Sequence, residues 1–288
     1  MLKWVVTGLV LLAWPVWADS QTVNLGDRYY VIDLPAKAAN APMILALHGG
    51  GGSPAQFARD SGLSADASAA GYAVIYPAGV GRLRLLTWNG GYCCGYAHKS
   101  GSDDQGFLAA VIADAGTRFG LNGNRVYLTG MSNGAIMAET FAALHPGYIR
   151  AVAAVSGTMD VRSVAPKQAV PLLIIHGTAD SHVQYRGGAG PDALVDTDFA
   201  SVDAVIAAFV AVNAPMVASA RLIDKVNDGT RVQQTDYTDA KGRVQIRLLA
   251  VQGGGHVWPG GARLKHRDEN TKDIRANDEI LRFFALHP

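Results

Sequence analysis

The chain has 288 residues, of which 49% are hydrophobic, and this suits one sizeable globular domain. Its 25 lysine and arginine residues nearly balance its 24 aspartate and glutamate residues. A nearly neutral chain without basic clusters does not favour nucleic acid or an anionic membrane surface as a partner.

The N-terminal stretch MLKWVVTGLVLLAWPVWADS has a lysine, an apolar run and then Val16-Trp17-Ala18. This order predicts a secretory signal peptide over residues 1–18, followed by a single domain over residues 19–288. The alternative is a membrane anchor, but Gly8 and Pro15 interrupt the run, and it is shorter than the ~20 residues of a membrane span. We therefore expect a secreted or periplasmic protein that is not inserted in a membrane after cleavage.

Short apolar runs followed by turn residues alternate with helical patterns along the rest of the chain. The runs expected to form strands are 29–34, 42–50, 72–79, 125–134, 149–157 and 170–180. Helices are expected at 103–120, 133–146, 201–213 and 278–288, and a hairpin at 230–251. This alternation predicts an α/β fold, in which a mostly parallel, doubly wound sheet has helices on both faces. Active residues are then expected in loops at the carboxyl ends of the strands.

The pentapeptide Gly130-Met131-Ser132-Asn133-Gly134 lies between an expected strand and an expected helix. A G-x-S-x-G pattern alone is a weak signal in a glycine-rich chain. In this context, a sharp strand-to-helix turn would expose the hydroxyl of Ser132, and the flanking glycines would avoid clashes. The alternative is a buried serine in a glycine turn. We predict that Ser132 is a nucleophile.

A serine hydroxyl needs a histidine base that is itself oriented by a carboxylate. Asp180 follows an expected strand in LLIIHGTADSHV, and His256 follows another in LLAVQGGGHVWPGG. Both come after the serine in the required order of serine, acid and histidine. Asp160 and His182 are weaker candidates, because Asp160 is close to the serine in sequence and His182 is two residues from Asp180.

The tetrahedral intermediate of such a reaction needs two backbone N–H donors. Asn133, the residue after the nucleophile, is expected to supply one. The loop LALHGGGGSP is expected to supply the other from Gly50, with Gly51 as the alternative. No phosphate-binding glycine motif follows a strand here, so a nucleotide site is not expected. His48 and His176, inside strand-end turns, are expected to bind backbone groups.

Six motifs carry a family resemblance: LHGGGG, WNGGYCCGYA, DDQGFL, RVYLTGMSNGA, HGTAD and GGGHVWPGG. In this order they resemble the polyhydroxybutyrate depolymerase-like and feruloyl esterase-like α/β-hydrolases, over roughly residues 25–286. The resemblance implies Ser132 as nucleophile, Asp180 as orienting acid and His256 as base. It also implies a secreted esterase that needs no metal and no cofactor, with aryl esters of plant cell-wall sugars, short hydroxyacid polyesters or simple esters as substrates.

Depolymerases of this family that attack solid polymer usually carry an added polymer-binding domain, and little sequence follows the last expected helix. We therefore expect a small-molecule or oligomeric ester, first a feruloyl, aryl or other short soluble ester. A polyhydroxybutyrate or other hydroxyalkanoate depolymerase is the alternative. The same triad also serves serine peptidases and acyltransferases. A non-catalytic carbohydrate- or lipid-binding protein on a hydrolase scaffold is the alternative of another class, against which the intact triad argues.

The loop of residues 79–102 is long and rich in glycine and aromatic residues, which is common in functional loops. We expect Trp88 and Trp258 to border the pocket, where a flat ring could stack on an aryl group. For Trp88, packing in a local core is the alternative.

The same loop holds the two cysteines of the chain, Cys93 and Cys94, which are adjacent and cannot connect distant segments. Metal binding needs more ligands than the loop offers, and an intermolecular disulfide would leave one thiol over. Since free exposed thiols tend not to persist after export, we predict a disulfide between the two neighbours. It would form a stiff, apolar part of the pocket wall.

Overall fold

The computed structural model describes residues 20–82, 85–193, 195–215, 217–262 and 268–288. The predicted signal peptide lies outside these residues, so it and the domain boundary after residue 18 stay predictions. In the described part of the chain, no helix combines the length and the apolar character needed to cross a membrane.

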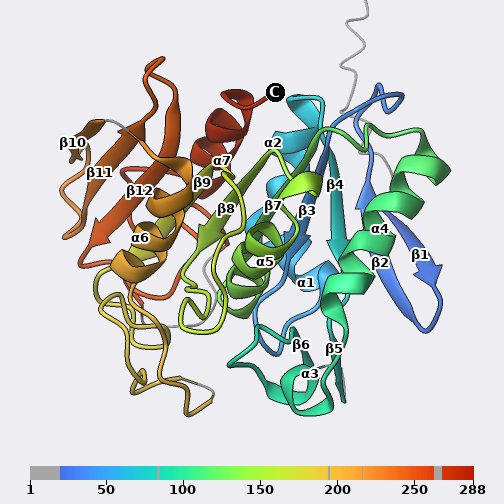
Figure 1. The fold of residues 1–288 in the computed structure, drawn as a ribbon, viewed down its shortest axis with the longest axis horizontal. Helices are drawn as coiled ribbons and strands as arrows, with labels where there is room; N and C mark the ends of the chain where they lie inside the picture. Colours follow the sequence, from blue (N-terminus) through green and yellow to red (C-terminus); the bar gives the residue numbers. More distant parts are fainter. Residues whose placement is uncertain (1–19, 83–84, 194, 216, 263–267) are drawn as a thin grey trace, which may run out of the picture.

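Ten of the described strands form one sheet in the order β1-β2-β4-β3-β7-β8-β9-β12-β11-β10 (Figure 1). The first half contains β1 (Gln21–Leu25), β2 (Arg28–Asp33), β4 (Ala73–Pro77), β3 (Met43–Leu47) and β7 (Val126–Met131). The second half contains β8 (Ala151–Val155), β9 (Leu172–Gly177), β12 (Val244–Gln252), β11 (Arg231–Thr238) and β10 (Val217–Ile223). The six strands from β4 to β12 are parallel, and antiparallel strands flank them at both edges.

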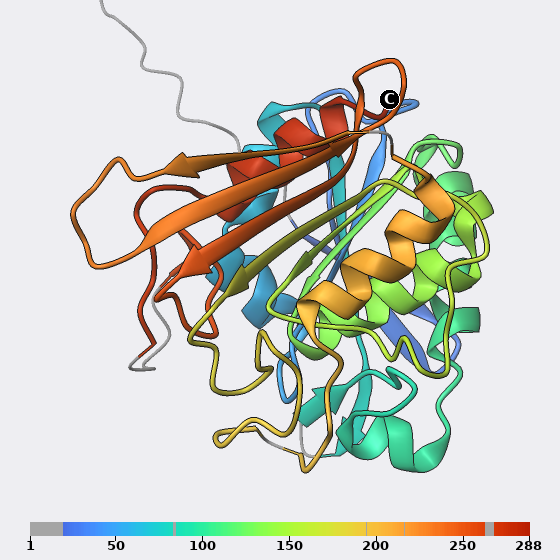
Figure 2. The same cartoon turned by 60° about the vertical axis from the view of Figure 1, so that its left-hand side comes forward.

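Helices cover both faces of this sheet (Figures 1 and 2). One face carries α4 (Asp104–Phe119), α5 (Asn133–Leu144) and α6 (Val202–Asn213). The other face carries α1 (Pro54–Ser61), α2 (Leu63–Ala69) and α7 (Ala276–Ala285). Each layer buries its own apolar cluster against the sheet. The predicted doubly wound α/β fold is confirmed, and so is the hairpin, which is formed by β11 and β12.

Helix α5 is the most enclosed of the described helices, and it begins directly after β7. Its residues from Asn133 to Ala143 are all buried, as is typical of a helix that is apolar around its whole circumference. It packs against both β7 and β8. The serine turn before α5 is therefore held by the interior of the protein rather than by a mobile surface loop.

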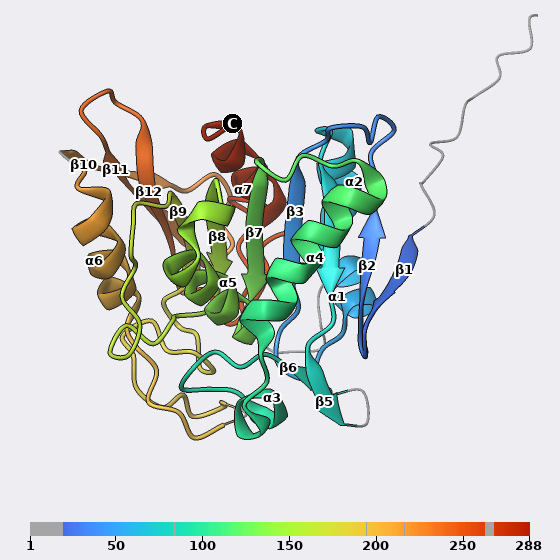
Figure 3. The same ribbon diagram turned by 45° about the vertical axis from the view of Figure 1, so that its right-hand side comes forward.

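The small elements η1 (Pro146–Tyr148), α3 (Gly95–Ser100), β5 (Val80–Arg82) and β6 (Leu85–Thr87) lie in connections between the larger ones. The last three gather at the carboxyl ends of the parallel strands, the lower edge in Figure 3. Strands β3, β7, β9 and β12 point to this same edge because they are mutually parallel. Loops from distant parts of the sequence thus meet there.

Candidate active site

Ser132 forms the turn between β7 and α5 in a backbone conformation that side chains rarely adopt, with φ 56° and ψ −125°. The neighbouring glycines make this turn possible. A Cβ atom at Gly130 would lie 2.5 Å from the carbonyl carbon of Gly134, and one at Gly134 would lie 2.2 Å from the carbonyl oxygen of Leu47. Both distances are far below van der Waals contact, so the sequence pattern G-x-S-x-G here has a steric cause.

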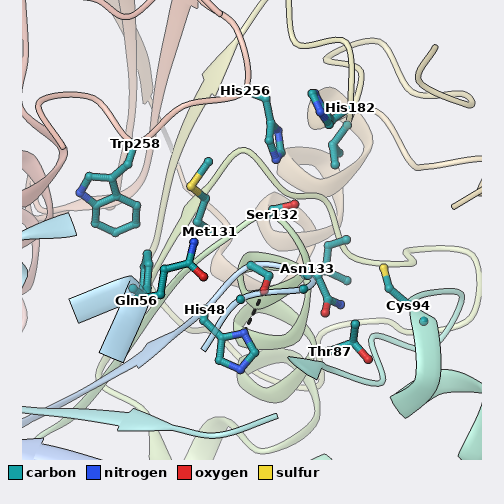
Figure 4. Close-up of a pocket in the computed structure, with 18 of the residues that line it drawn as sticks. His48, Gln56, Thr87, Cys94, Met131, Ser132, Asn133, His182, His256 and Trp258 are labelled. Atoms are coloured by element: carbon teal, nitrogen blue, oxygen red, sulfur yellow. Dashed lines mark hydrogen bonds between the residues drawn. The ribbon is translucent and has the colours of Figure 1, made fainter. Parts of the chain in front are cut away.

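Asp180 and His256 meet at this turn, although 76 positions separate them in the chain. The Nδ1 of His256 lies 2.8 Å from Oδ2 of Asp180. The other carboxylate oxygen, Oδ1, accepts the backbone N–H groups of His182 and Val183, each at 2.9 Å. Because the carboxylate accepts at Nδ1, the Nε2 of His256 is left for another partner, and Figure 4 shows this ring pointing toward Ser132.

Two more histidines, His176 and His182, lie beside Asp180 and His256. Burial alone would raise the pKa of Asp180, but hydrogen bonds from His176 and His256 outweigh it and hold the pKa well below its usual value. The Nε2 of His176 donates to the Val183 carbonyl at 2.8 Å, which confirms that this histidine binds backbone. His182 stacks on His256 with ring centroids 4.7 Å apart, and burial followed by the charge of His256 lowers the pKa of His182.

The glycine loop after β3 lies on the opposite side of Ser132. The N–H of Gly51 donates to the carbonyl of Leu86 at 2.8 Å, so this donor is already used. Gly50 therefore remains the candidate for the second oxyanion donor, and an added Cβ there would lie 3.6 Å from Cβ of Asn133. Gly50, Ser132 and Asn133 all line the same pocket.

His48 holds this loop through both ring nitrogens. Its Nε2 accepts the N–H of Gly79 at 3.0 Å, and its Nδ1 therefore carries the hydrogen that it donates to the Gly49 carbonyl at 2.8 Å (dashed in Figure 4). Burial lowers the pKa of His48 to about 4, so the ring is neutral at physiological pH. The expectation that His48 binds backbone groups is confirmed.

The pocket at this edge of the sheet has a volume of about 620 Å³ and contains Ser132 and His256 in its wall. Figure 4 shows Trp258 and Gln56 on one side of Ser132 and Cys94 and Thr87 on the other. Apolar side chains line part of the wall: Leu85, Tyr96, Ile136, Val183, Val195 and Phe199. Polar side chains line another part: Gln56, Asp60, His182, Asp268 and Asn270.

The two tryptophans differ in their relation to the pocket. Trp258 lines it and is 6% exposed, while its Nε1 donates to Oδ1 of Asn277 at 2.9 Å. Trp88 does not line it, which corrects the expectation that this ring borders the pocket. The ring is fully buried because it packs beside His48, at a centroid distance of 5.0 Å, and donates its indole N–H inward.

Cys93 and Cys94 are joined by a disulfide in the structure, across a cis peptide bond. Cys94 lines the pocket, whereas Cys93 lies beneath the surface, where its sulfur is 3.9 Å from Nδ2 of Asn133. The expectation that both cysteines form the wall is therefore corrected for Cys93. Its side chain contacts Asn133 at the start of α5 and belongs to the same apolar cluster as Ile136 of that helix.

Among the described residues, one group of potential metal ligands lies near the site. Ligand atoms of Asp180, His182 and His256 are within 4.8 Å of one another. Two of these three side chains already share the hydrogen bond described above, so a metal ion would have to replace it.

Sequence reasoning missed one buried acid beneath the site. Glu139 of α5 has no exposed surface, accepts the N–H of Met159 at 2.8 Å and has a pKa that burial raises well above the usual value. It secures the loop after β8 below the pocket. It is the single charged residue of a mostly apolar helix, and this is the sequence signal that points to it.

Comparisons with known proteins agree with this architecture. Residues 28–159 match the family model described as Esterase PHB depolymerase. The protein NocK of Nocardia uniformis subsp. tsuyamanensis, named as an esterase, is 30% identical over 240 residues, covering 79% of this chain and 68% of the relative. Feruloyl esterase B of Talaromyces stipitatus is 32% identical over 159 residues, covering 52% of this chain and 44% of the relative.

Solved structures show the same fold. The acetyl xylan esterase of Aspergillus awamori has a TM-score of 0.61 at 16% identity, with 93% of this chain and 100% of that chain covered. Esterase PE8 has a TM-score of 0.55 at 17% identity, with 89% and 97% covered. The chain thus has the α/β-hydrolase fold and belongs to the polyhydroxybutyrate depolymerase-like and feruloyl esterase-like family of carboxylic ester hydrolases.

Proposed function

We propose that this chain is a serine esterase in which Ser132 is the nucleophile, His256 the general base and Asp180 the acid that orients it. The observation that carries the proposal is the 2.8 Å bond from His256 Nδ1 to Asp180, with the same imidazole directed at a serine on a strained strand-to-helix turn. A serine hydroxyl becomes nucleophilic in such an arrangement because the imidazole accepts its proton.

In the proposed reaction, Ser132 Oγ attacks the ester carbonyl carbon while Nε2 of His256 takes the hydroxyl proton. The N–H groups of Asn133 and Gly50 stabilise the negative oxygen of the tetrahedral intermediate. The imidazolium then gives its proton to the leaving alcohol, and the acyl group remains on the serine. Water then attacks the carbonyl of the acyl-serine while His256 takes its proton. Return of that proton to Ser132 Oγ releases the carboxylic acid and restores the enzyme.

The test is the Ser132→Ala variant with p-nitrophenyl acetate. We expect its turnover to fall to background and its labelling by a fluorophosphonate probe to disappear, while the wild-type protein reacts with both. Wild-type turnover in Ser132→Ala would contradict the nucleophile. Absence of both turnover and labelling in the folded wild-type protein would favour the alternative of a non-catalytic binding protein.

For the substrate, we propose a feruloyl, aryl or other short soluble ester. The apolar part of the pocket wall, with Cys94, Ile136, Val183 and Phe199, supplies a surface for a flat or short acyl group. Trp258 exposes only a small part of its ring to the pocket, so it serves as an edge contact and not as a broad stacking face. The name of the feruloyl esterase B relative supports this substrate class.

A hydroxyalkanoate oligomer or polymer is the second candidate, since the matched family model is described as a depolymerase. Parallel assays with methyl ferulate and with a poly(3-hydroxybutyrate) suspension distinguish the two. Ferulate release without clearing of the suspension is the expected result, and clearing without ferulate release would reverse the order. Peptide substrates in the same panel test for a peptidase.

We also propose that the protein is exported and loses residues 1–18. The mass of the protein from the periplasm or medium of an expressing bacterium should correspond to a chain that begins at Asp19. Alkylation before that mass measurement reports the state of the cysteines: no alkylated thiol is expected, and two would contradict the disulfide.

A further inference from the structure

Trp88 is fully buried, and its polar groups bind two particular segments besides its own loop, where its carbonyl also accepts the N–H groups of Gly90 and Cys94, each at 3.1 Å. Its backbone N–H donates to Oδ1 of Asn133 at 2.7 Å, and its carbonyl accepts from Nδ2 of the same side chain at 3.0 Å. Its indole N–H donates to the carbonyl of His48 at 2.9 Å. Trp88 therefore connects the first residue of α5 with the loop after β3, the two segments that carry the proposed oxyanion donors.

The bonds to Asn133 limit how that residue can move. Asn133 is 3% exposed, and its side-chain amide both accepts a hydrogen bond from the backbone of Trp88 and donates one to it. The sulfur of Cys93 adds a third contact, 3.9 Å from Nδ2. The side chain is thus not available to a substrate, and what it fixes is the orientation of its own backbone N–H.

The indole bond to His48 affects the other proposed donor, the N–H of Gly50, through the peptide between Gly49 and Gly50. The carbonyl of Gly49 points at Nδ1 of His48, and the N–H of Gly50 belongs to the same planar peptide and points the opposite way. The donor of Gly50 is therefore directed away from His48 as long as His48 keeps its place. The indole of Trp88 holds the carbonyl of that histidine and packs beside its ring.

Direct backbone contact completes the arrangement. An added Cβ at Gly134 would lie 2.5 Å from the His48 carbonyl, so only glycine lets α5 approach this loop so closely. The same carbonyl is the one that accepts the indole N–H. The two bonds to Asn133 use backbone groups and are open to any residue at position 88, whereas the indole bond to this carbonyl is the one that tryptophan itself supplies.

We propose that Trp88 is a positioning residue of the oxyanion hole, an inference that rests on the proposed function. It sets the separation and direction of the N–H groups of Asn133 and Gly50 without touching the substrate. Because an oxyanion hole acts on the negative oxygen that forms during the reaction, misplacing a donor lowers kcat and leaves KM nearly unchanged.

The test variant is Trp88→Phe, which keeps the backbone bonds and an aromatic ring but lacks the indole N–H. We expect kcat for p-nitrophenyl acetate to fall about tenfold, less than the roughly 10²–10³ for loss of a whole donor. KM should change less than about twofold. The inhibition constant of an alkyl trifluoromethyl ketone should rise by the same factor as kcat/KM falls, because its adduct with Ser132 places an alkoxide in the hole.

The matched control is Tyr127→Phe, which removes a hydroxyl that donates to the His287 carbonyl at 2.8 Å. Tyr127 lies near the amino end of β7, whereas Ser132 follows its carboxyl end. This variant should lose a similar free energy of unfolding and keep the wild-type kcat and inhibition constant. Equal behaviour of the two folded variants in both kinetic measurements would overturn the inference.

If Trp88→Phe does not fold, Asn133→Ala is the second variant, because it removes the two hydrogen bonds between the Asn133 side chain and the backbone of Trp88. It should show the same joint loss of kcat and of ketone affinity, and wild-type values would again overturn the inference. Failure of the proposed function looks different, since the wild-type protein would then lack turnover or Ser132→Ala would retain it.

Discussion

On one side of Ser132, Asp180 holds His256 by a charge-assisted hydrogen bond, and the carboxylate keeps its charge because histidine and backbone N–H groups surround it. On the other side, the loop that carries Gly50 is held by a neutral histidine and a buried indole. The two sides match the charges that develop in the proposed reaction. Positive charge on an imidazole is stabilised by a fixed anion, and negative charge on an oxygen is stabilised by fixed dipoles.

The two sides should therefore respond differently to substitution. Loss of charge on the acid–base side changes the chemistry while leaving the fold largely intact. Loss of a neutral contact on the oxyanion side changes both the geometry of the hole and the stability of the loop. Substitutions of Asp180, of His48 and of the two cysteines test this contrast.

The Asp180→Asn variant should lose roughly 10³–10⁴-fold in kcat, because an amide would orient the wrong tautomer of His256 and would not stabilise its imidazolium. Turnover of p-nitrophenyl acetate at saturating substrate measures this. Asp160→Asn is the matched control, since Asp160 also follows a parallel strand and is buried but pairs with Arg162. A loss of similar size in both variants would mean that the acid has been misassigned.

The His48→Gln variant should lose part of the acid sensitivity of the wild-type protein. The folded-state pKa of His48 is lowered to about 4, against about 6.5 in the unfolded chain. Between these values the unfolded chain binds a proton that the folded protein does not, so stability falls as pH falls from about 6.5 to about 4 and is fully present above that window. The contribution amounts to about 3 kcal/mol.

Urea unfolding of the wild type and His48→Gln at pH 7.5, 5.5 and 4.5 measures that contribution. The difference between their free energies of unfolding should shrink toward low pH. His287, whose pKa burial also lowers to about 4, is present in both proteins and so does not affect the difference. A difference that stays constant with pH would show that His48 is not a buried neutral group.

Replacing both Cys93 and Cys94 by serine should have the smallest effect, less than about tenfold in KM for methyl ferulate and little in kcat, because it alters packing at the pocket wall. Cys94 lines the pocket, while Cys93 lies beneath it, near Asn133 and in the apolar cluster that includes Ile136. Saturation kinetics of the variant give both constants. The same measurement on the wild-type protein with and without a reductant shows the effect of breaking the disulfide alone. A larger fall in kcat than in affinity would assign the pair to the oxyanion side instead.

Much of this fold can be predicted from the sequence because its signals are local. Apolar runs such as LLIIHG mark buried parallel strands, and the residues after them lie at one edge of the sheet. That is why Asp180 and His256 could be named as partners from a chain separation of 76 positions. The glycines around Ser132 likewise reflect a local steric need, which the close approach at Gly134 makes explicit.

Which loop groups face the pocket and which face the interior could not be predicted from the sequence. The burial of Trp88, the use of the Gly51 N–H by Leu86 and the inward side of Cys93 depend on contacts between segments that the sequence does not place relative to one another. From the sequence alone came the central strands, the four larger helices α4, α5, α6 and α7 and the residue types at the strand ends, since these follow from local periodicity and turn chemistry, whereas the edge strands β1 and β10 and the helices α1 and α2 were not expected. The register of the oxyanion loop and the role of Trp88 arise from long-range hydrogen bonds, which exist only once the sheet has brought β3, β7 and the loop after β6 together.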